Sequence, residues 1–247
     1  MVATTNGAGF LTHFQVENYI NLSLFGVDLS VSNAVVWMWF AALTAFIFFM
    51  LAFRRPRLIP GRFQALAEMG HGFILDMVNK NVRPEGRRYF SVMFTLFFFI
   101  LFSNLVGLIP GGFTPTSQII ITATLAITIF VMTVVIRILK HGFGFFRAFV
   151  PHGLPVMILP LMVPIEMLSY IARPVSLAVR LFANMTAGHT VLAVIAILGS
   201  AIPWVVSILP LGLSVVLLGV EVFIAFIQAF IFTILACVYI DDALDEV

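Results

Sequence analysis

Arg180 is the residue of this chain whose chemistry is hardest to place. It lies in the largely apolar stretch 176–189, and no Lys, Arg, Asp or Glu occurs between Leu181 and Val220. An arginine side chain does not lose its proton in proteins, so it cannot escape its charge in an apolar setting. Near the centre of a bilayer this charge costs roughly 2.5–3.5 kcal/mol, which makes Arg180 a candidate functional residue.

Other polar residues follow Arg180 at helical spacing. Glu166, Arg173 and Arg180 are seven positions apart, and Asn184 comes one turn later. Residues at this spacing share one face of a helix. His189 is nine positions after Arg180, which places it on the opposite side of an ideal helix.

A second polar pair occurs after the break at 199–203. Glu221 and Gln228 are also seven positions apart. Antiparallel folding about the break predicts that Arg180 lies at the depth of Gln228 and that His189 lies at the depth of Glu221. The sequence therefore predicts two polar levels, one with a fixed positive charge and one with titratable groups.

The two levels suit different chemistry. A histidine near a glutamate can exchange protons with water around physiological pH. A permanent cation keeps an approaching carboxylate ionised, with an attraction of about 4 kcal/mol at 4 Å and an effective dielectric constant of 20. It also repels protons and so blocks a direct leak. The chain has no mobile carboxylate at the level of Arg180, so we expect the partner acid to come from another chain.

The composition identifies an integral membrane protein. The chain is 62% hydrophobic and 10% charged, against about 25% charged residues in soluble domains. Cys237 is the single cysteine, which excludes an intrachain disulfide. Nucleotide-binding and metalloprotease motifs are missing, so we expect no cofactor or metal on this chain and no nucleic-acid partner.

The first half of the chain predicts three upright spans and a surface helix. Residues 1–33 form an external segment. Uncharged runs over 34–53, 89–110 and 118–137 are long enough to cross a hydrocarbon core of roughly 30 Å. Residues 61–81 alternate apolar and polar positions at helical spacing, which is typical of an amphipathic helix on a membrane surface.

The second half predicts a long hairpin with arms 155–198 and 204–240, followed by an acidic tail, 241–247. At roughly 1.5 Å per residue the first arm is longer than the bilayer core is thick. It must kink into two upright spans or tilt steeply, and the lack of a polar loop favours the tilt. The predicted fold is an all-α membrane protein with three upright spans, a surface amphipathic helix and a steeply tilted C-terminal helical hairpin.

Basic residues mark one side of the membrane. Eleven of the 13 Lys and Arg residues lie between Arg54 and Arg147, in two loops on one side, and none lies in 1–33 or 109–118. The positive-inside rule then places the N-terminus outside and the C-terminus in the cytoplasm. No transit-type segment precedes the first span, which favours a bacterial inner membrane over the alternative, a mitochondrial inner membrane.

Four segments resemble a known family. They are Pro174–Met185 with its Arg-x-x-x-Asn core, Ala187–His189, Gln228–Phe232 and Asn104–Pro110. Together they closely resemble subunit a of F-type ATP synthases, and the similarity covers nearly the whole chain. The resemblance implies a proton-translocating stator subunit against which a ring of c subunits turns. Its implied partners are the c-ring, peripheral-stalk b-type subunits, the remaining F1Fo complex and membrane lipid, and nucleotide chemistry takes place on other chains.

The resemblance also implies roles for individual residues. Arg180 matches the arginine that faces the ring carboxylates. The half-channel on the N-terminal side corresponds to Asn184, His189, Glu221 and Gln228. The cytoplasmic half-channel corresponds to Glu166, Arg173 and Ser176. The acid and the histidine occupy each other's places relative to the enterobacterial pattern, so which of His189 and Glu221 takes the proton first stays open.

Other functions fit the sequence less well. An autonomous ion or proton secondary transporter would show two related halves, which this chain lacks. An intramembrane hydrolase using Glu166 or His189 has no supporting nucleophile or metal spacing. Structural roles also stay open: Arg180 paired with a nearby acid, or His189 and Glu221 as a static brace of the hairpin.

Overall fold

The computed structural model describes residues 18–20, 23–24, 27–28, 31–54, 56, 58–109, 112–142, 159–201 and 208–244. Several segments expected from the sequence extend beyond these residues. The first residues of both hairpin arms, the end of the second upright span and the end of the acidic tail lie outside the described part, at 155–158, 204–207, 110 and 245–247.

Six α-helices make up most of the described residues: α1 (Asn33–Phe53), α2 (Arg62–Asn81), α3 (Phe90–Gly107), α4 (Ile119–His141), α5 (Leu159–Ala201) and α6 (Ile208–Leu244). Two 3-10 turns, η2 (Pro84–Tyr89) and η3 (Pro115–Ser117), precede α3 and α4. The predicted all-α class is confirmed, and five helical segments are long and apolar enough to cross a membrane.

Four short strands precede α1. Strand β1 (Asn18–Ile20) pairs antiparallel with β4 (Val31–Ser32), and β2 (Ser23–Leu24) pairs antiparallel with β3 (Val27–Asp28). These two small ladders are connected to the helical bundle through β4, which leads directly into α1.

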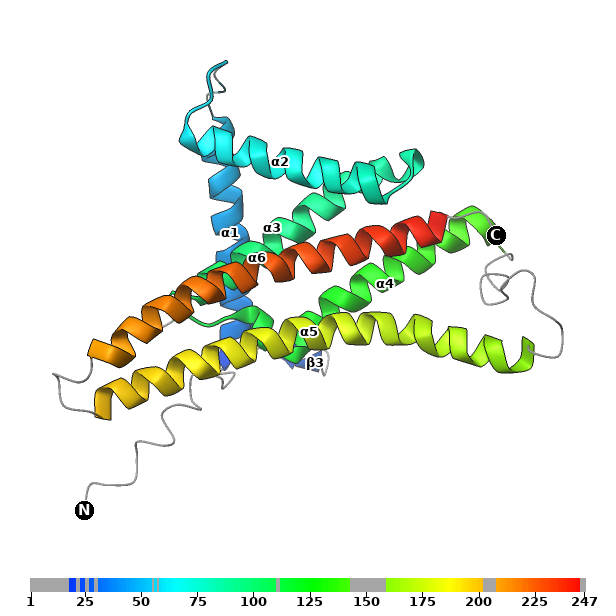
Figure 1. Cartoon of the computed structure of the whole chain (residues 1–247). Coiled ribbons are helices and arrows are strands. Elements are labelled where there is room, and N and C mark those ends of the chain that lie inside the picture. The colour runs from blue at the N-terminus through cyan, green and yellow to red at the C-terminus, as the bar shows by residue number, and fades with distance from the viewer. Residues whose placement is uncertain are drawn as a thin grey trace.

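Helix α2 differs from α1, α3 and α4 because charged side chains are distributed along its length among apolar ones: Arg62, Glu68, Asp76 and Lys80. Ala67, Ile74 and Val78 are buried, and α2 packs against α1, α3 and α6. Figure 1 shows α2 lying across the end of α1 rather than along it. An amphipathic helix that crosses the end of a span has the geometry of a surface helix.

Helices α5 and α6 run side by side and cross α1 (Figure 1). Helix α5 continues through Pro164 and Pro174 without interruption. A proline inside a helix removes one backbone hydrogen bond, which helices in a packed membrane bundle tolerate. The 43 residues of α5 correspond to about 65 Å, roughly twice the thickness of a hydrocarbon core.

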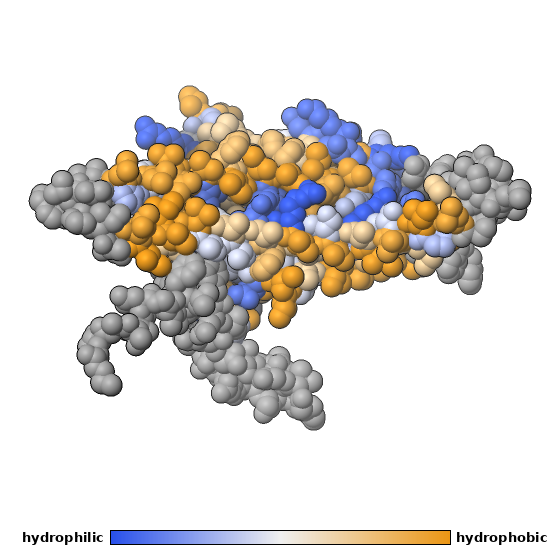
Figure 2. Space-filling view, turned by 60° about the horizontal axis from the view of Figure 1, so that its bottom comes forward, coloured by the Kyte–Doolittle hydropathy of each residue, from blue (hydrophilic) through white to orange (hydrophobic). Residues whose placement is uncertain are grey.

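The core lies where α6 packs against α3, α4 and α5. Phe97, Ile100, Leu181, Phe232 and Ile240 are almost completely buried there. The outer surfaces are also apolar: the face seen in Figure 2 is mostly hydrophobic, with hydrophilic residues grouped within the apolar surface. Because apolar side chains cover both the inside and much of the outside, this surface suits lipid rather than water.

Candidate functional site

Arg180 lies on the exposed side of α5. Leu177, Ala178 and Leu181 on the same helix point into the core, whereas Arg180 and Asn184 are exposed. Arg180 forms no ion pair with any residue that the structure describes. The guanidinium is therefore open to a group outside the described chain, and a structural role in which it pairs with a neighbouring acid finds no support here.

Small side chains share the face of α5 that carries Arg180. The exposed residues at helical spacing on this face are Ser169, Ala172, Ser176, Ala183, Asn184 and Ala187. Small residues allow the backbone of a second helix to approach closely in a membrane. The exposed face of α5 thus combines room for another helix with one unpaired positive charge at its middle.

His189 and Glu221 meet where α5 and α6 run side by side. His189 Nδ1 lies 3.9 Å from Glu221 Oε1, and their side chains are 17% and 5% exposed. This distance confirms the prediction that the two residues lie at one level of the hairpin. The carboxyl group packs against Gly188 of α5, where any larger side chain would collide with it.

Glu221 is buried without hydrogen bonds. Neither of its carboxyl oxygens has a hydrogen-bond partner among the described residues. A buried polar group without partners costs free energy, and more so when it is charged. A carboxyl group that only braced α5 against α6 would gain nothing that offsets this cost. The arrangement therefore favours a chemical role for the Glu221 carboxyl group.

Thr114 completes this group, and the sequence reasoning missed it. Its hydroxyl lies 2.6 Å from His189 Nε2, from a position 75 residues earlier in the chain. Thr114 directly precedes η3 and is 4% exposed. The available signal was the cluster of hydroxyl residues at 114–117 directly after a membrane span, which also has the composition of an ordinary turn.

The other predicted level is less well defined. Gln228 is buried, whereas Arg180 is exposed, and no hydrogen bond joins them in the described structure. Their common depth remains a prediction. Asn184 and Ser176 are exposed on the same face of α5 as Arg180. Glu166 is half-exposed and lies seven residues before Arg173 on this helix.

Arg173 belongs to a different group of charges near the end of α6. Its Nη1 donates to Asp242 Oδ2 at 2.8 Å, and its guanidinium lies over the rings of Tyr170 and Tyr239. Asp242 was expected in an acidic tail beyond the hairpin. In the structure it lies in the last turn of α6, which continues to Leu244.

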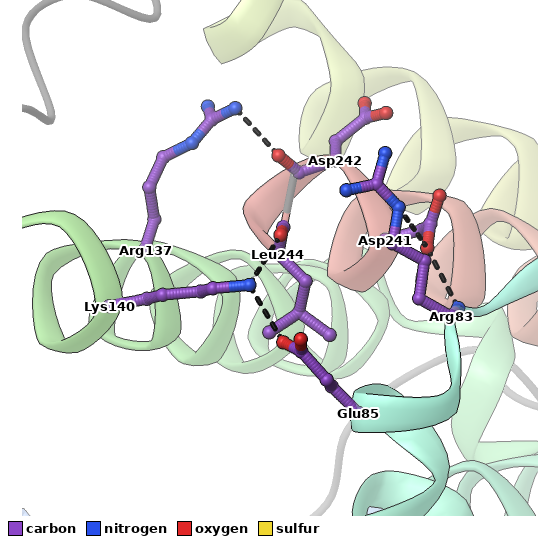
Figure 3. Close-up of polar contacts among 7 residues, drawn as sticks. All are labelled: Arg83, Glu85, Arg137, Lys140, Asp241, Asp242 and Leu244. Carbon is purple, nitrogen blue, oxygen red and sulfur yellow. Dashed lines mark hydrogen bonds and ion pairs between the residues drawn. The ribbon is translucent and has the colours of Figure 1, made fainter. Parts of the chain in front are cut away.

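Figure 3 shows the other residues of this group: Arg83, Glu85, Arg137, Lys140, Asp241, Asp242 and Leu244. Together with Arg173 we call them the C-terminal cluster. Arg137 and Lys140 of α4 donate to the carbonyl oxygens of Asp242 and Leu244 at 2.7 and 2.8 Å. Lys140 also pairs with Glu85 at 2.7 Å. Cations at the carbonyl end of a helix satisfy free acceptors and complement the helix dipole.

The described residues contain no group of three or more His, Cys, Asp or Glu side chains that could hold a metal ion. Cys237 is buried in the core and reads as a packing residue. On α5 and α6 the groups that we consider for chemistry are the open guanidinium of Arg180 and the pair of His189 and Glu221, with the Thr114 hydroxyl beside His189. These can attract an anion and pass protons, respectively.

Comparison with known proteins agrees with this chemistry. The family model for the ATP synthase A chain matches residues 35–241. A protein from Magnetococcus marinus named ATP synthase subunit a is 52% identical over 238 residues, which cover 95% of this chain and 92% of the relative. A protein of the same name from Hyphomonas neptunium is 43% identical over 237 residues, covering 94% of each.

Proposed function

The chain belongs to the ATP synthase A chain family, and we propose that its Arg180 separates two aqueous half-channels and faces the carboxylates of a rotating c-ring. The subunit acts in proton translocation as part of the membrane sector of the synthase. Its partner is the rest of the F1Fo complex, and enzymatic activity belongs to that complex as a whole.

The observation that carries this proposal is the open guanidinium on the small-residue face of α5. Arg180 has no ion pair in the described chain, so its charge is available to a carboxylate on another helix. At about 4 Å and an effective dielectric constant of 20, the two charges attract by about 4 kcal/mol. This attraction favours release of the proton from each ring carboxyl group that approaches.

The two sides of Arg180 have different roles in the proposal. On the N-terminal side, protons reach the ring through His189 and Glu221, with Gln228 and Asn184 nearer the ring. On the cytoplasmic side they leave past Ser176, Glu166 and Arg173. Arg180 stands between the two routes, and its positive charge repels protons that would otherwise cross directly.

The proposed membrane placement follows from helix lengths and charge. Helices α1, α3 and α4 stand as upright spans, α2 lies on the cytoplasmic surface, and α5 and α6 form a steeply tilted hairpin. A helix of about 65 Å fits a core of roughly 30 Å only if it tilts steeply. The N-terminus is outside and the C-terminus cytoplasmic, and the bacterial relatives favour a bacterial inner membrane. Peripheral-stalk b-type subunits hold the subunit against rotation.

The test is Arg180→Ala in membranes, with ATP-driven proton pumping and passive proton leak measured together. We expect pumping to be lost and the leak to stay equal or to increase, because the positive barrier is removed. Val179→Ala is the matched control, since Val179 is an exposed neighbour on α5 without charge, and it should leave both rates near wild type. Normal pumping by the Arg180 variant would refute the proposal.

A further inference from the structure

A buried loop, rather than a helix, closes one side of the His189 site. Residues 113–117 between α3 and α4 are all buried, and η3 packs against α1, α3, α4 and α5. A buried turn needs partners for its backbone and side-chain polar groups. The contacts of this loop therefore show which groups it serves.

The loop is fixed by its own hydrogen bonds. Ser117 donates to the Thr114 carbonyl oxygen through both its backbone amide, at 3.1 Å, and its hydroxyl, at 2.7 Å. The Thr116 hydroxyl donates to Asn104 Oδ1 of α3 at 2.7 Å. At Gly107 of α3 a larger side chain would collide with the Thr114 side chain. These contacts fix the loop against α3 with the Thr114 hydroxyl 2.6 Å from His189 Nε2.

We infer that Thr114 is a positioning residue for proton transfer, which holds His189 with its Nδ1 facing Glu221. This inference rests on the proposed function, because it assigns a partner to the histidine of the proposed proton route. The Thr114 hydroxyl lies 2.6 Å from Nε2, and Glu221 Oε1 lies 3.9 Å from Nδ1. The ring is thus held between a hydroxyl and a carboxyl group, one at each nitrogen.

A hydroxyl suits this place because it can both donate and accept a hydrogen bond. When Nε2 carries a proton, this N–H group donates a hydrogen bond to the Thr114 oxygen. When Nε2 is bare, the Thr114 hydroxyl donates to it. A charged imidazole can then release its Nδ1 proton to the Glu221 carboxylate and become a neutral ring with the proton on Nε2, without turning. The reverse transfer follows the same path.

The 3.9 Å separation of His189 and Glu221 is longer than a hydrogen bond. A proton can pass between the two side chains only after they approach to hydrogen-bond distance. Because Thr114 holds the His189 ring in place, this approach depends on Glu221 alone. A methyl group at Gly188 would collide with the Glu221 carboxyl group, so the glycine is what allows that group to lie this close to α5 and to His189.

Charges from other elements leave this pair undisturbed. Helices α1 and α3 and the η3 turn carry no ionisable side chain. Arg137 and Lys140 of α4 lie in the C-terminal cluster, at the opposite end of that helix from η3. Arg180, nine positions before His189 on α5, is exposed on another face. Glu221 is the one charged or titratable group that faces His189 from the described part of α6.

The test compares Thr114→Val, which removes the hydroxyl and keeps the branched shape, with Thr114→Ser, which keeps the hydroxyl. Both are assembled in the full complex, and ATP-driven pumping per complex is measured as a function of pH. We expect Thr114→Val to slow pumping about three- to tenfold, the usual cost of a lost buried hydrogen bond, and to shift the pH profile. Thr114→Ser should stay within about twofold of wild type, with the wild-type profile.

Two controls separate positioning from packing. Thr124→Val removes a hydroxyl that bonds only to the backbone of its own helix and should change nothing. In a His189→Gln background, Thr114→Val should cause no further shift of the pH profile, because the ring that it positions is gone.

Three outcomes would overturn the inference: a wild-type rate and profile for Thr114→Val, equal defects in the Val and Ser variants, or an undiminished effect of Thr114→Val without His189. Arg180→Ala is measured alongside. If Arg180→Ala pumps normally, the proposed function itself fails. If Arg180→Ala is inactive and Thr114→Val is normal, only the role of Thr114 is lost.

Discussion

Two polar groups that involve residues of α5 and α6 are built on opposite principles. The first, which we call the buried relay, consists of Thr114, His189 and Glu221, and its carboxyl group has no hydrogen-bond partner in the described structure. The second is the C-terminal cluster, in which Arg173 and Asp242 form a 2.8 Å ion pair between partly exposed side chains. About 24 Å of helix separates Arg173 from His189 along α5.

We assign the C-terminal cluster to the fold and, under the proposed function, the buried relay to proton transfer. The partly exposed ion pairs of the C-terminal cluster hold a helix end in place at little cost, and each such pair contributes about 0–1 kcal/mol. A buried carboxyl group without partners opposes stability. Under the proposed function, the fold retains this group because it exchanges protons, as functional sites often sacrifice stability.

The largest effect is expected from Glu221→Gln, which keeps the shape of the buried relay but removes its acid. Positioned acids and bases typically contribute a factor of 10² or more, and we expect ATP-driven pumping to fall by about tenfold or more, with a changed pH profile. Val222→Ala, at an exposed position of the same helix, should pump normally. Full activity and an unshifted profile in Glu221→Gln would identify the pair as a static brace and remove the contrast with the C-terminal cluster.

A smaller effect is expected from Gly188→Ala. The added methyl group would collide with the Glu221 carboxyl group, so this group must move away from His189. We expect pumping to slow about three- to tenfold, as for the loss of one buried contact. Gly219→Ala is the matched control, because a methyl group there meets no atom within 4 Å. Equal rates for the two variants would show that the position of the carboxyl group is unimportant.

Asp242→Asn addresses the C-terminal cluster. It weakens the ion pair with Arg173, whose two side chains are 33% and 44% exposed. Because pairs of this kind contribute about 0–1 kcal/mol, we expect pumping within about twofold of wild type and a slightly lower temperature of inactivation. Asp242→Glu should restore that temperature. A loss of pumping comparable with Glu221→Gln would place the cluster in the proton route and not in the fold alone.

The smallest effect is expected from Lys140→Met, observed through its dependence on salt. Lys140 bonds to Glu85 and to the Leu244 carbonyl oxygen at the surface of the bundle. Charges at the surface are screened at 1 M salt, where the Debye length is about 3 Å. The difference in inactivation temperature between wild type and this variant should therefore shrink at high salt, whereas the pumping defect of Gly188→Ala should not. A salt-sensitive Gly188→Ala defect would contradict a buried relay.

Periodicity and charge patterns predicted much of this protein because a membrane imposes simple constraints. A run without charges has to form a helix in lipid, since only a helix satisfies its own backbone. The seven-residue spacing of Glu221 and Gln228 and the break between the hairpin arms predicted which residues of α5 and α6 share a level. For His189 and Glu221 the 3.9 Å separation confirms it.

The same reasoning failed where the chain leaves regular structure or turns back on itself. Thr114 lies in a turn, and turn composition does not say which distant helix the turn contacts. Asp242 looked like part of a solvated tail, because an acidic chain end is usually solvated. Its pairing with Arg173 depends on how far α6 continues and on where α5 passes it.

Residue types and helical spacing were enough to predict a membrane-spanning chain, a permanent cation among apolar residues, and a histidine and a glutamate at one level. These properties follow from residue type and helical period, which act locally. Packing explains why Arg173 is paired while Arg180 has no ion pair among the described residues, and why a loop hydroxyl reaches His189. Such choices depend on contacts between residues 69 to 75 positions apart, and packing brings those residues together.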